Sequence, residues 1–188
     1  VLEESARRHF DLLVRAMPAR DAYGDLEREL AACDHHLLLV PGPCALPRSA
    51  LVCVAVGEPG KEDVLFAGRL LRHLGARATI ACVLPTTARP DIQEQAERFL
   101  AAGERTLSVL DVAANTRVRR GAVREEILNE LREGEHDFLV LGAPLPNRRG
   151  IVSLEGFVGD MLEAMKKRPV LIVRSHDVRF QPEHGEGY

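Results

Sequence analysis

Four short apolar runs, rich in β-branched residues, constrain the fold of this 188-residue chain more than any other feature. They are residues 51–56 (LVCVAV), 78–84 (ATIACVL), 138–141 (FLVL) and 170–173 (VLIV). Runs of this length without polar alternation are typical of strands that are buried on both faces of a parallel sheet. A fifth, more polar strand is predicted at residues 116–119, and its polarity favours a place at a sheet edge.

The segments between these runs have the periodicity of amphipathic helices. After the first run, Val64, Ala67 and Leu71 recur at helical spacing, and Gly75 marks the end of that helix. Strands that alternate with helices are joined by right-handed crossovers, which cover both faces of the sheet. The sequence therefore predicts an α/β fold with a five-stranded parallel sheet and helices on both faces.

The first 41 residues have the pattern of the end of such a domain, not of its beginning. At a constant offset of 126, six residues of the first 18 are repeated: Leu2, Glu4, Asp11, Leu13, Val14 and Pro18 match Leu128, Glu130, Asp137, Leu139, Val140 and Pro144. Residues 37–40 (LLLV) then correspond to residues 170–173. An internal repeat of this kind indicates tandem domains, although Leu-rich helices can also match by chance.

The repeat predicts four parts of the chain. Residues 1–41 form the C-terminal half of a first domain, with the order helix, strand, helix, strand. Residues 42–49 form a Pro-rich linker, because prolines resist regular secondary structure. Residues 50–174 form a complete domain, and the polar residues 175–188 form a mobile tail.

Composition excludes several classes of protein. The formal net charge is -3 and there is no Trp, which argues against a nucleic-acid partner. No apolar run approaches the roughly 18 residues of a membrane span, so we expect no membrane segment in this chain and a cytoplasmic location. The four cysteines have no CxxC spacing, and Cys53 and Cys82, which lie in apolar runs, are expected to be free buried thiols. Because the first residue is Val, we expect a longer or processed parent chain, in which the sequence could be a cytoplasmic tail.

Residues 50–174 resemble a universal stress protein domain. The resemblance rests on five segments in the family's order: ALVCVAVG (50–57), HLGARATIACVLP (73–85), GAVREEIL (121–128), HDFLVLGA (136–143) and RPVLIV (168–173). It implies a Rossmann-like sheet of the adenine nucleotide alpha hydrolase type, with strand order 3-2-1-4-5. It also implies a homodimer or a tandem pair that meets through the strand Val170–Val173, and an adenine nucleotide as the ligand of some members.

The family's nucleotide site is only partly matched. Its pattern has an Asp at the end of strand one, where this chain has Gly57, and a loop G-x2-G-x9-G-[ST] after strand four. Here Gly142 matches the first glycine, Leu145 replaces the second, and Phe157 replaces the hydroxyl after Gly156. A displaced loop could still use glycine and arginine to meet phosphate. The candidate crevice residues are therefore Gly57, Gly142, Ala143, Arg148, Arg149, Gly150, Gly156 and Phe157.

Two functions follow from this resemblance. The first is a non-enzymatic regulatory or protective module that acts through dimerisation and has a degenerate nucleotide loop, with no cofactor. The alternative is a stress sensor that binds ATP or AMP through the altered loop, and a slow ATP hydrolase is a more distant one. The sequence contains no recognisable catalytic constellation or set of metal ligands.

Overall fold

A computed structural model describes residues 11–32, 35–56, 58–144, 147 and 151–174. Its strands are β1 (Leu12–Ala16), β2 (His36–Val40), β3 (Ser49–Cys53), β4 (Arg77–Leu84), β5 (Ala114–Arg120), β6 (Phe138–Gly142) and β7 (Val170–Val173). Its helices are α2 (Tyr23–Ala32), α3 (Glu58–Leu74), α4 (Pro90–Val109), α5 (Val123–Glu133) and α6 (Phe157–Ala164), with a short 3-10 helix at Arg20–Ala22.

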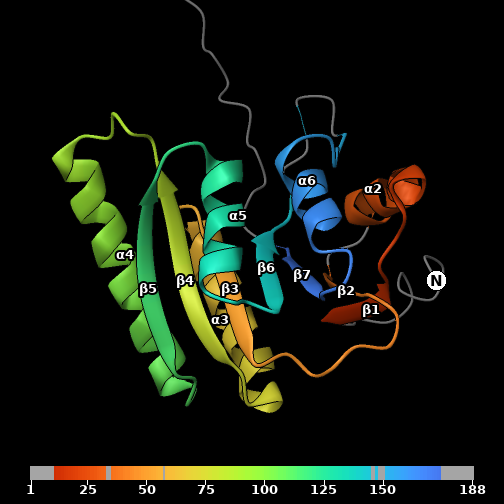
Figure 1. The fold of residues 1–188 in the computed structure, drawn as a ribbon, viewed down its shortest axis with the longest axis horizontal. Helices are drawn as coiled ribbons and strands as arrows, with labels where there is room; N and C mark the ends of the chain where they lie inside the picture. The colour runs from red at the N-terminus through yellow and green to blue at the C-terminus, as the bar shows by residue number, and fades with distance from the viewer. Residues whose placement is uncertain (1–10, 33–34, 57, 145–146, 148–150, 175–188) are drawn as a thin grey trace, which may run out of the picture.

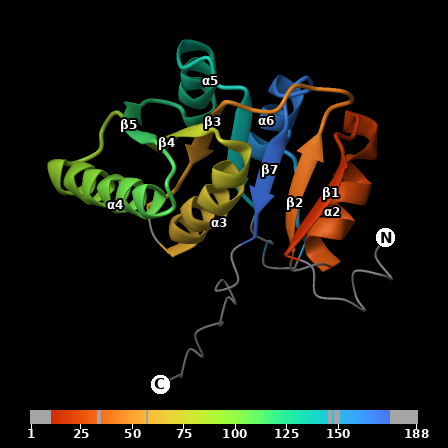
Figure 2. The same cartoon turned by 90° about the horizontal axis from the view of Figure 1, so that it is seen from below.

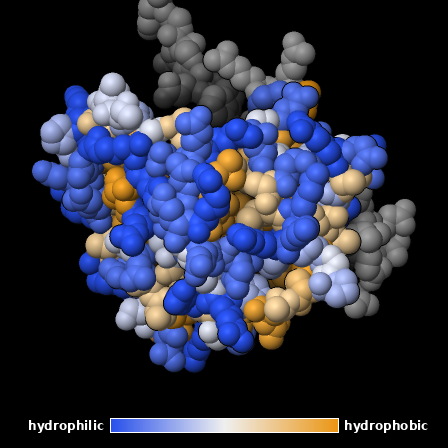
Figure 3. Space-filling view, viewed as in Figure 1, coloured by the Kyte–Doolittle hydropathy of each residue, from blue (hydrophilic) through white to orange (hydrophobic). Residues whose placement is uncertain are grey.

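All seven strands form one sheet between two layers of helices (Figures 1 and 2). Helices α3 and α4 pack on one face through residues such as Val64 and Leu100. Helices α2, α5 and α6 pack on the other face through residues such as Leu26, Ile127 and Met161. The outer surface of this second layer is mainly hydrophilic (Figure 3), as expected for helices with one apolar stripe. Within the described residues, none of the helices has the length and apolarity needed to cross a bilayer.

The prediction of a five-stranded parallel sheet is wrong, because the sheet has seven strands in the order β1-β2-β7-β6-β3-β4-β5. The five predicted strands are present as β3 to β7, and their order matches 3-2-1-4-5. The polar strand β5 lies at an edge, as predicted. The two additional strands come from the first 41 residues. Strand β2 pairs with β7 in the antiparallel direction, so the sheet is also not wholly parallel.

The pairing of β1 with β2 has the same register as the pairing of β6 with β7. Val14 is opposite Leu38 in the first pair, and Val140 is opposite Leu171 in the second. Leu38 is also opposite Leu171 where β2 meets β7. These are the residues that the sequence repeat equates with each other. A local two-fold relation between the pair β1–β2 and the pair β7–β6 would produce this register.

The edge strand Val170–Val173 therefore finds its second neighbour within the chain. Strand β7 has β6 on one side and β2 on the other. Because both sides of β7 are occupied, β7 offers no free edge for pairing with another copy. Unpaired backbone N–H and C=O groups of an apolar edge strand favour association with another strand. Here β2 is the strand that pairs with them.

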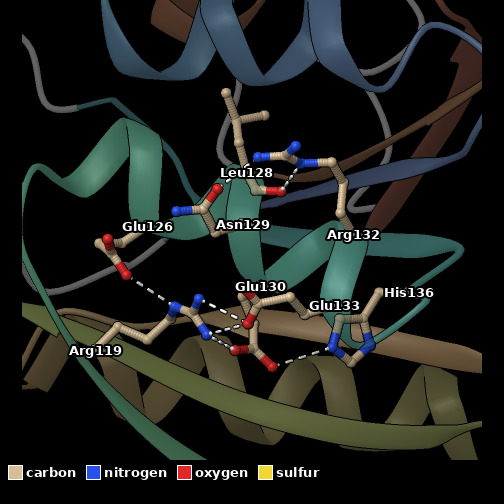
Figure 4. Close-up of polar contacts among 8 residues, drawn as sticks. All are labelled: Arg119, Glu126, Leu128, Asn129, Glu130, Arg132, Glu133 and His136. Carbon is tan, nitrogen blue, oxygen red and sulfur yellow. Dashed lines mark hydrogen bonds and ion pairs between the residues drawn. The ribbon is translucent and has the colours of Figure 1, made fainter.

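A cluster of charged side chains joins β5 to α5 (Figure 4). The guanidinium of Arg119 donates to Glu126 at 2.9 Å, to Glu130 at 2.8 Å and to Glu133 at 2.8 Å. Glu130 is 4% exposed, and its other oxygen lies 3.6 Å from Nε2 of the buried His136. Burial lowers the pKa of His136, so that the imidazole is neutral at pH 7. Arg119 is therefore the cation that balances the buried carboxylate of Glu130.

Replacing Arg119 with methionine is expected to lower the free energy of unfolding by about 2 kcal/mol at pH 7, because Glu130 then loses its cation. The methionine keeps an apolar stem of similar length, so lost packing contributes little. Urea unfolding followed by circular dichroism measures the change. Arg117→Met, at an exposed position of the same strand, is the control and should change stability by less than about 0.5 kcal/mol. Equal losses in the two variants would contradict the role given to Arg119.

Candidate ligand crevice

A cavity of about 590 Å³ opens at the carboxyl ends of β3, β4 and β6. Strand β3 lies between β4 and β6, and the helices that follow β3 and β5 pack on opposite faces of the sheet. The strand order reverses at this point, which is where open α/β sheets bind ligands. The cavity is lined mainly by apolar groups from the strand ends and from the start of α5, among them Val54, Val56, Ala81, Val83, Leu84, Val123, Ile127 and Leu141.

Three of the predicted site residues line this cavity. Gly142 and Ala143 line it from the end of β6, and Phe157 lines it from the first turn of α6. Gly156 directly precedes α6 and has φ 95°, a conformation that favours glycine. The other four, Gly57, Arg148, Arg149 and Gly150, lie outside the described residues.

Three solved structures that superpose on this chain are all universal stress proteins. A universal stress protein in complex with cAMP superposes with a TM-score of 0.56 and 20% identity, covering 69% of this chain and 98% of that chain. A universal stress protein from Archaeoglobus fulgidus DSM 4304 superposes with a TM-score of 0.67 and 13% identity. It covers 94% of this chain, which spans 64% of the Archaeoglobus chain. The chain has the universal stress protein fold.

A third structure shows the same fold in a plant protein. The universal stress protein family member from Arabidopsis thaliana, with AMP bound, has a TM-score of 0.52 and 14% identity over 73% of this chain and 97% of that chain. By sequence, no family model and no curated protein matches the chain. The likeness at these identities therefore concerns the fold, and the crevice must be judged from its own residues.

The segment that leads into α6 is held by the core and by α2. Helix α6 begins at Phe157, which packs partly against the core. The backbone N–H of Leu154 donates to Glu27 of α2 at 2.7 Å. Helix α2 therefore holds the segment that leads into α6.

Asp63, a carboxyl group in the wall of the crevice, was not predicted from the sequence. Asp63 lies on α3, is 4% exposed and lines the cavity. Its Oδ1 atom has no hydrogen-bond partner within the described residues. Burial, and then the neighbouring Glu62, raise the pKa of Asp63 to about 7. A signal was present in the sequence, because Asp63 precedes Ala67 by four residues and so belongs to the apolar stripe of the helix.

The position of Asp63 also explains why residue 142 is a glycine. A Cβ atom at residue 142 would lie 3.1 Å from Oδ2 of Asp63, which is tighter than most such contacts. The carboxyl group of Asp63 thus lies next to the space that a Cβ atom at residue 142 would need. An ionised carboxylate there would repel an anion, which opposes the approach of phosphate at this end of the loop.

The thiol of Cys53 shares this wall of the crevice. Burial, followed by the carboxyl groups of Asp63 and Glu130, raises the pKa of Cys53. The group is therefore held as an unreactive thiol, because the thiolate is the nucleophilic form. Cys53 and Cys82 are free, as predicted, and the exposed Cys44 is free as well. Among the described residues there is also no group of three or more His, Cys, Asp or Glu side chains that could hold a metal ion.

Proposed function

We propose that the chain is a regulatory module of the universal stress protein type whose crevice binds the adenosine part of an adenine nucleoside or nucleotide, without catalysis. The cavity at the reversal of strand order carries this proposal. Its size falls in the range of small-molecule sites, and its lining is largely apolar with few polar groups, which suits a planar heterocycle. Solved structures of the same fold with cAMP and AMP bound support an adenine ligand.

The phosphate is proposed to add little to the binding. The aromatic ring of Phe157 and the carboxyl group of Asp63 both line the cavity, and neither attracts a phosphate. The cation in the wall, Arg174, donates from its guanidinium to the carbonyl oxygen of Leu30. Calorimetric titration with adenosine, AMP and ATP tests this. We expect dissociation constants of about 10–100 µM that differ by less than about threefold among the three ligands. The absence of binding by all three at about 1 mM would overturn the proposed function.

The alternative is a nucleotide sensor in which Arg148, Arg149 and Gly150 hold the phosphates. It is favoured if ATP binds at least about tenfold more tightly than adenosine, and if Arg148→Ala with Arg149→Ala removes that difference. The two candidates therefore separate in a single set of titrations.

The domain organisation is part of the proposal. Residues 1–41 are proposed to be the C-terminal half of a universal stress protein domain, joined through residues 42–49 to a complete domain at 50–174, which the tail 175–188 follows. The equal registers of β1–β2 and β6–β7 support this organisation. The Archaeoglobus protein supports it as well, because its single chain superposes on 94% of this one.

Dimerisation is proposed to occur through β1, since β7 is already paired on both sides. In the described part of the chain, β1 has a strand on one side only, and Val14 on it is 57% exposed. The antiparallel contact of β2 with β7 supports a pairing of this kind between strand edges. Sedimentation should give about twice the mass of one chain, 20.7 kDa, for the unmutated sequence. For Val14→Lys it should give the mass of one chain. A monomeric parent protein at about 100 µM would refute this part of the proposal.

A further inference from the structure

We infer that Asp63 determines the specificity of the crevice and that its carboxyl group binds the amino edge of a heterocycle, in which an N–H donor stands beside a ring nitrogen. Aminopurines, such as adenine, belong to this class. The inference rests on the proposed function and goes beyond it, because it names the group of the ligand that is recognised and the residue that recognises it.

The first argument is the placement of Asp63. Its side chain comes from α3, which packs on the face of the sheet opposite to α5. It reaches the cavity beside the end of β6, where Gly142 leaves it room. Apart from Arg174, the other residues of the wall offer backbone and apolar or uncharged side chains, such as Cys53 and Val54. The carboxyl group is therefore the polar group that a ligand meets on this side.

The second argument is the unsatisfied hydrogen bonding of Asp63. Buried polar groups in folded proteins almost always have a partner, but Oδ1 of Asp63 has none among the described residues. A cationic side chain in the wall, Arg174, donates from its guanidinium to the carbonyl oxygen of Leu30 on α2. A ligand that supplies an N–H donor would satisfy Oδ1.

The third argument is the match between a carboxyl group and an amino edge. A carboxylate accepts a hydrogen bond from the amino group. A protonated carboxyl group makes two bonds, because its O–H donates to the ring nitrogen while its other oxygen accepts from the amino group. A phosphate presents negatively charged oxygen atoms. These suit neither the carboxylate nor the protonated carboxyl group as well as the amino edge does. The amino edge of the base thus offers a donor beside an acceptor, which fits Asp63 in either protonation state.

The experiment compares adenosine with purine riboside, which has the same ring and sugar but lacks the amino group. Calorimetry at pH 7 is expected to show that the parent protein binds adenosine at least about tenfold more tightly, because a site built to hydrogen-bond a group rejects the analogue that lacks it. Asp63→Leu, which removes the acceptor and keeps the branched shape of the side chain, should abolish this preference and leave the affinity for purine riboside within about threefold.

Asp63→Asn is the conservative variant. The amide retains an oxygen acceptor and adds an N–H donor, so it can still pair with the amino edge. We expect it to keep the preference for adenosine, whereas a merely structural role of Asp63 would give the Asn and Leu substitutions the same effect. Asp91→Leu, at an exposed position on α4, is the matched control and should change neither affinity.

The outcomes separate this inference from the proposed function. If adenosine binds but the preference over purine riboside is absent, or survives in Asp63→Leu, the inference about Asp63 is wrong and the adenosine site remains. If the parent protein binds neither ligand, both are wrong. Circular dichroism of each variant establishes that it is folded before the titration.

Discussion

Replacing Asp63 with asparagine is expected to stabilise the unliganded chain by about 3 kcal/mol at pH 8 and to have little effect below pH 4. Burial first, and Glu62 second, raise the pKa of Asp63 from an ordinary value of 3.8 to about 7. Above pH 7 the carboxyl group is ionised in both states, and the folded state carries the cost of a buried charge without a partner. The neutral amide of asparagine avoids that cost.

The pH dependence has a definite sign. At pH values below the ordinary pKa of 3.8 the carboxyl group is protonated in both states, so the parent protein and the Asp63→Asn variant differ little in stability. As the pH rises from about 4 to about 7, the unfolded state ionises while the folded state holds its proton, and the parent protein loses stability relative to the variant. Above about pH 7 the difference stays constant.

Urea unfolding at pH 4, 6 and 8 measures this difference. Asp91→Asn is the matched control, since Asp91 is exposed and pairs with the exposed Arg89 at 2.7 Å, and its effect should stay within about 0.5 kcal/mol at each pH. A destabilising effect of Asp63→Asn at pH 8 would mean that a partner balances the carboxylate. The crevice would then lack the unsatisfied group on which the inference about its specificity depends.

Asp63 lowers the stability of the unliganded protein and lies in the wall of a ligand cavity. This combination indicates a binding role. Perturbed titratable groups gather at functional sites, because a site keeps the polar group that its ligand needs, whatever the free protein loses by it. In the described structure, Oδ1 of Asp63 makes no hydrogen bond that would offset the cost of its burial. A ligand that supplies the missing donor would recover part of the lost stability.

The local pattern of the sequence predicted the elements well and their long-range pairing poorly. The apolar runs at β3, β4, β6 and β7 and the polar edge strand β5 could be predicted because burial on two faces excludes polar side chains. The pairing of β2 with β7 could not be predicted in the same way. Both strands are short apolar runs, and whether they meet in one chain or across two depends on contacts far apart in sequence.

The crevice was predicted in its position but not in its chemistry. Gly142, Ala143 and Phe157 line the cavity because parallel strands bring their carboxyl ends to one edge of the sheet. Asp63 was not predicted because a single acidic residue in an amphipathic helix is usually on the solvated side. Its place on the apolar stripe becomes informative only when the helix is known to cover the end of β6.

Replacing Leu39 with alanine is expected to lower the free energy of unfolding of the whole described fold by about 3 kcal/mol, within the usual range for a buried leucine. Leu39 lies on β2 and is 0% exposed. It belongs to one apolar cluster with Ile172 of β7 and Met161 of α6. A cavity at Leu39 therefore weakens the packing of the complete domain as well as that of the added strands.

The size and shape of the urea transition test whether the two parts of the chain form one cooperative unit. Val109→Ala, at the end of α4 and at a position that is 86% exposed, should change stability by less than about 0.5 kcal/mol. Leu39→Ala should move a single transition, and hydrogen exchange should show reduced protection in β7 as well as in β2. An unchanged main transition with a separate early one would mean that residues 12–40 unfold independently. The shared core would then be too weak to join a half-domain to its neighbour, and the proposed organisation would fail with it.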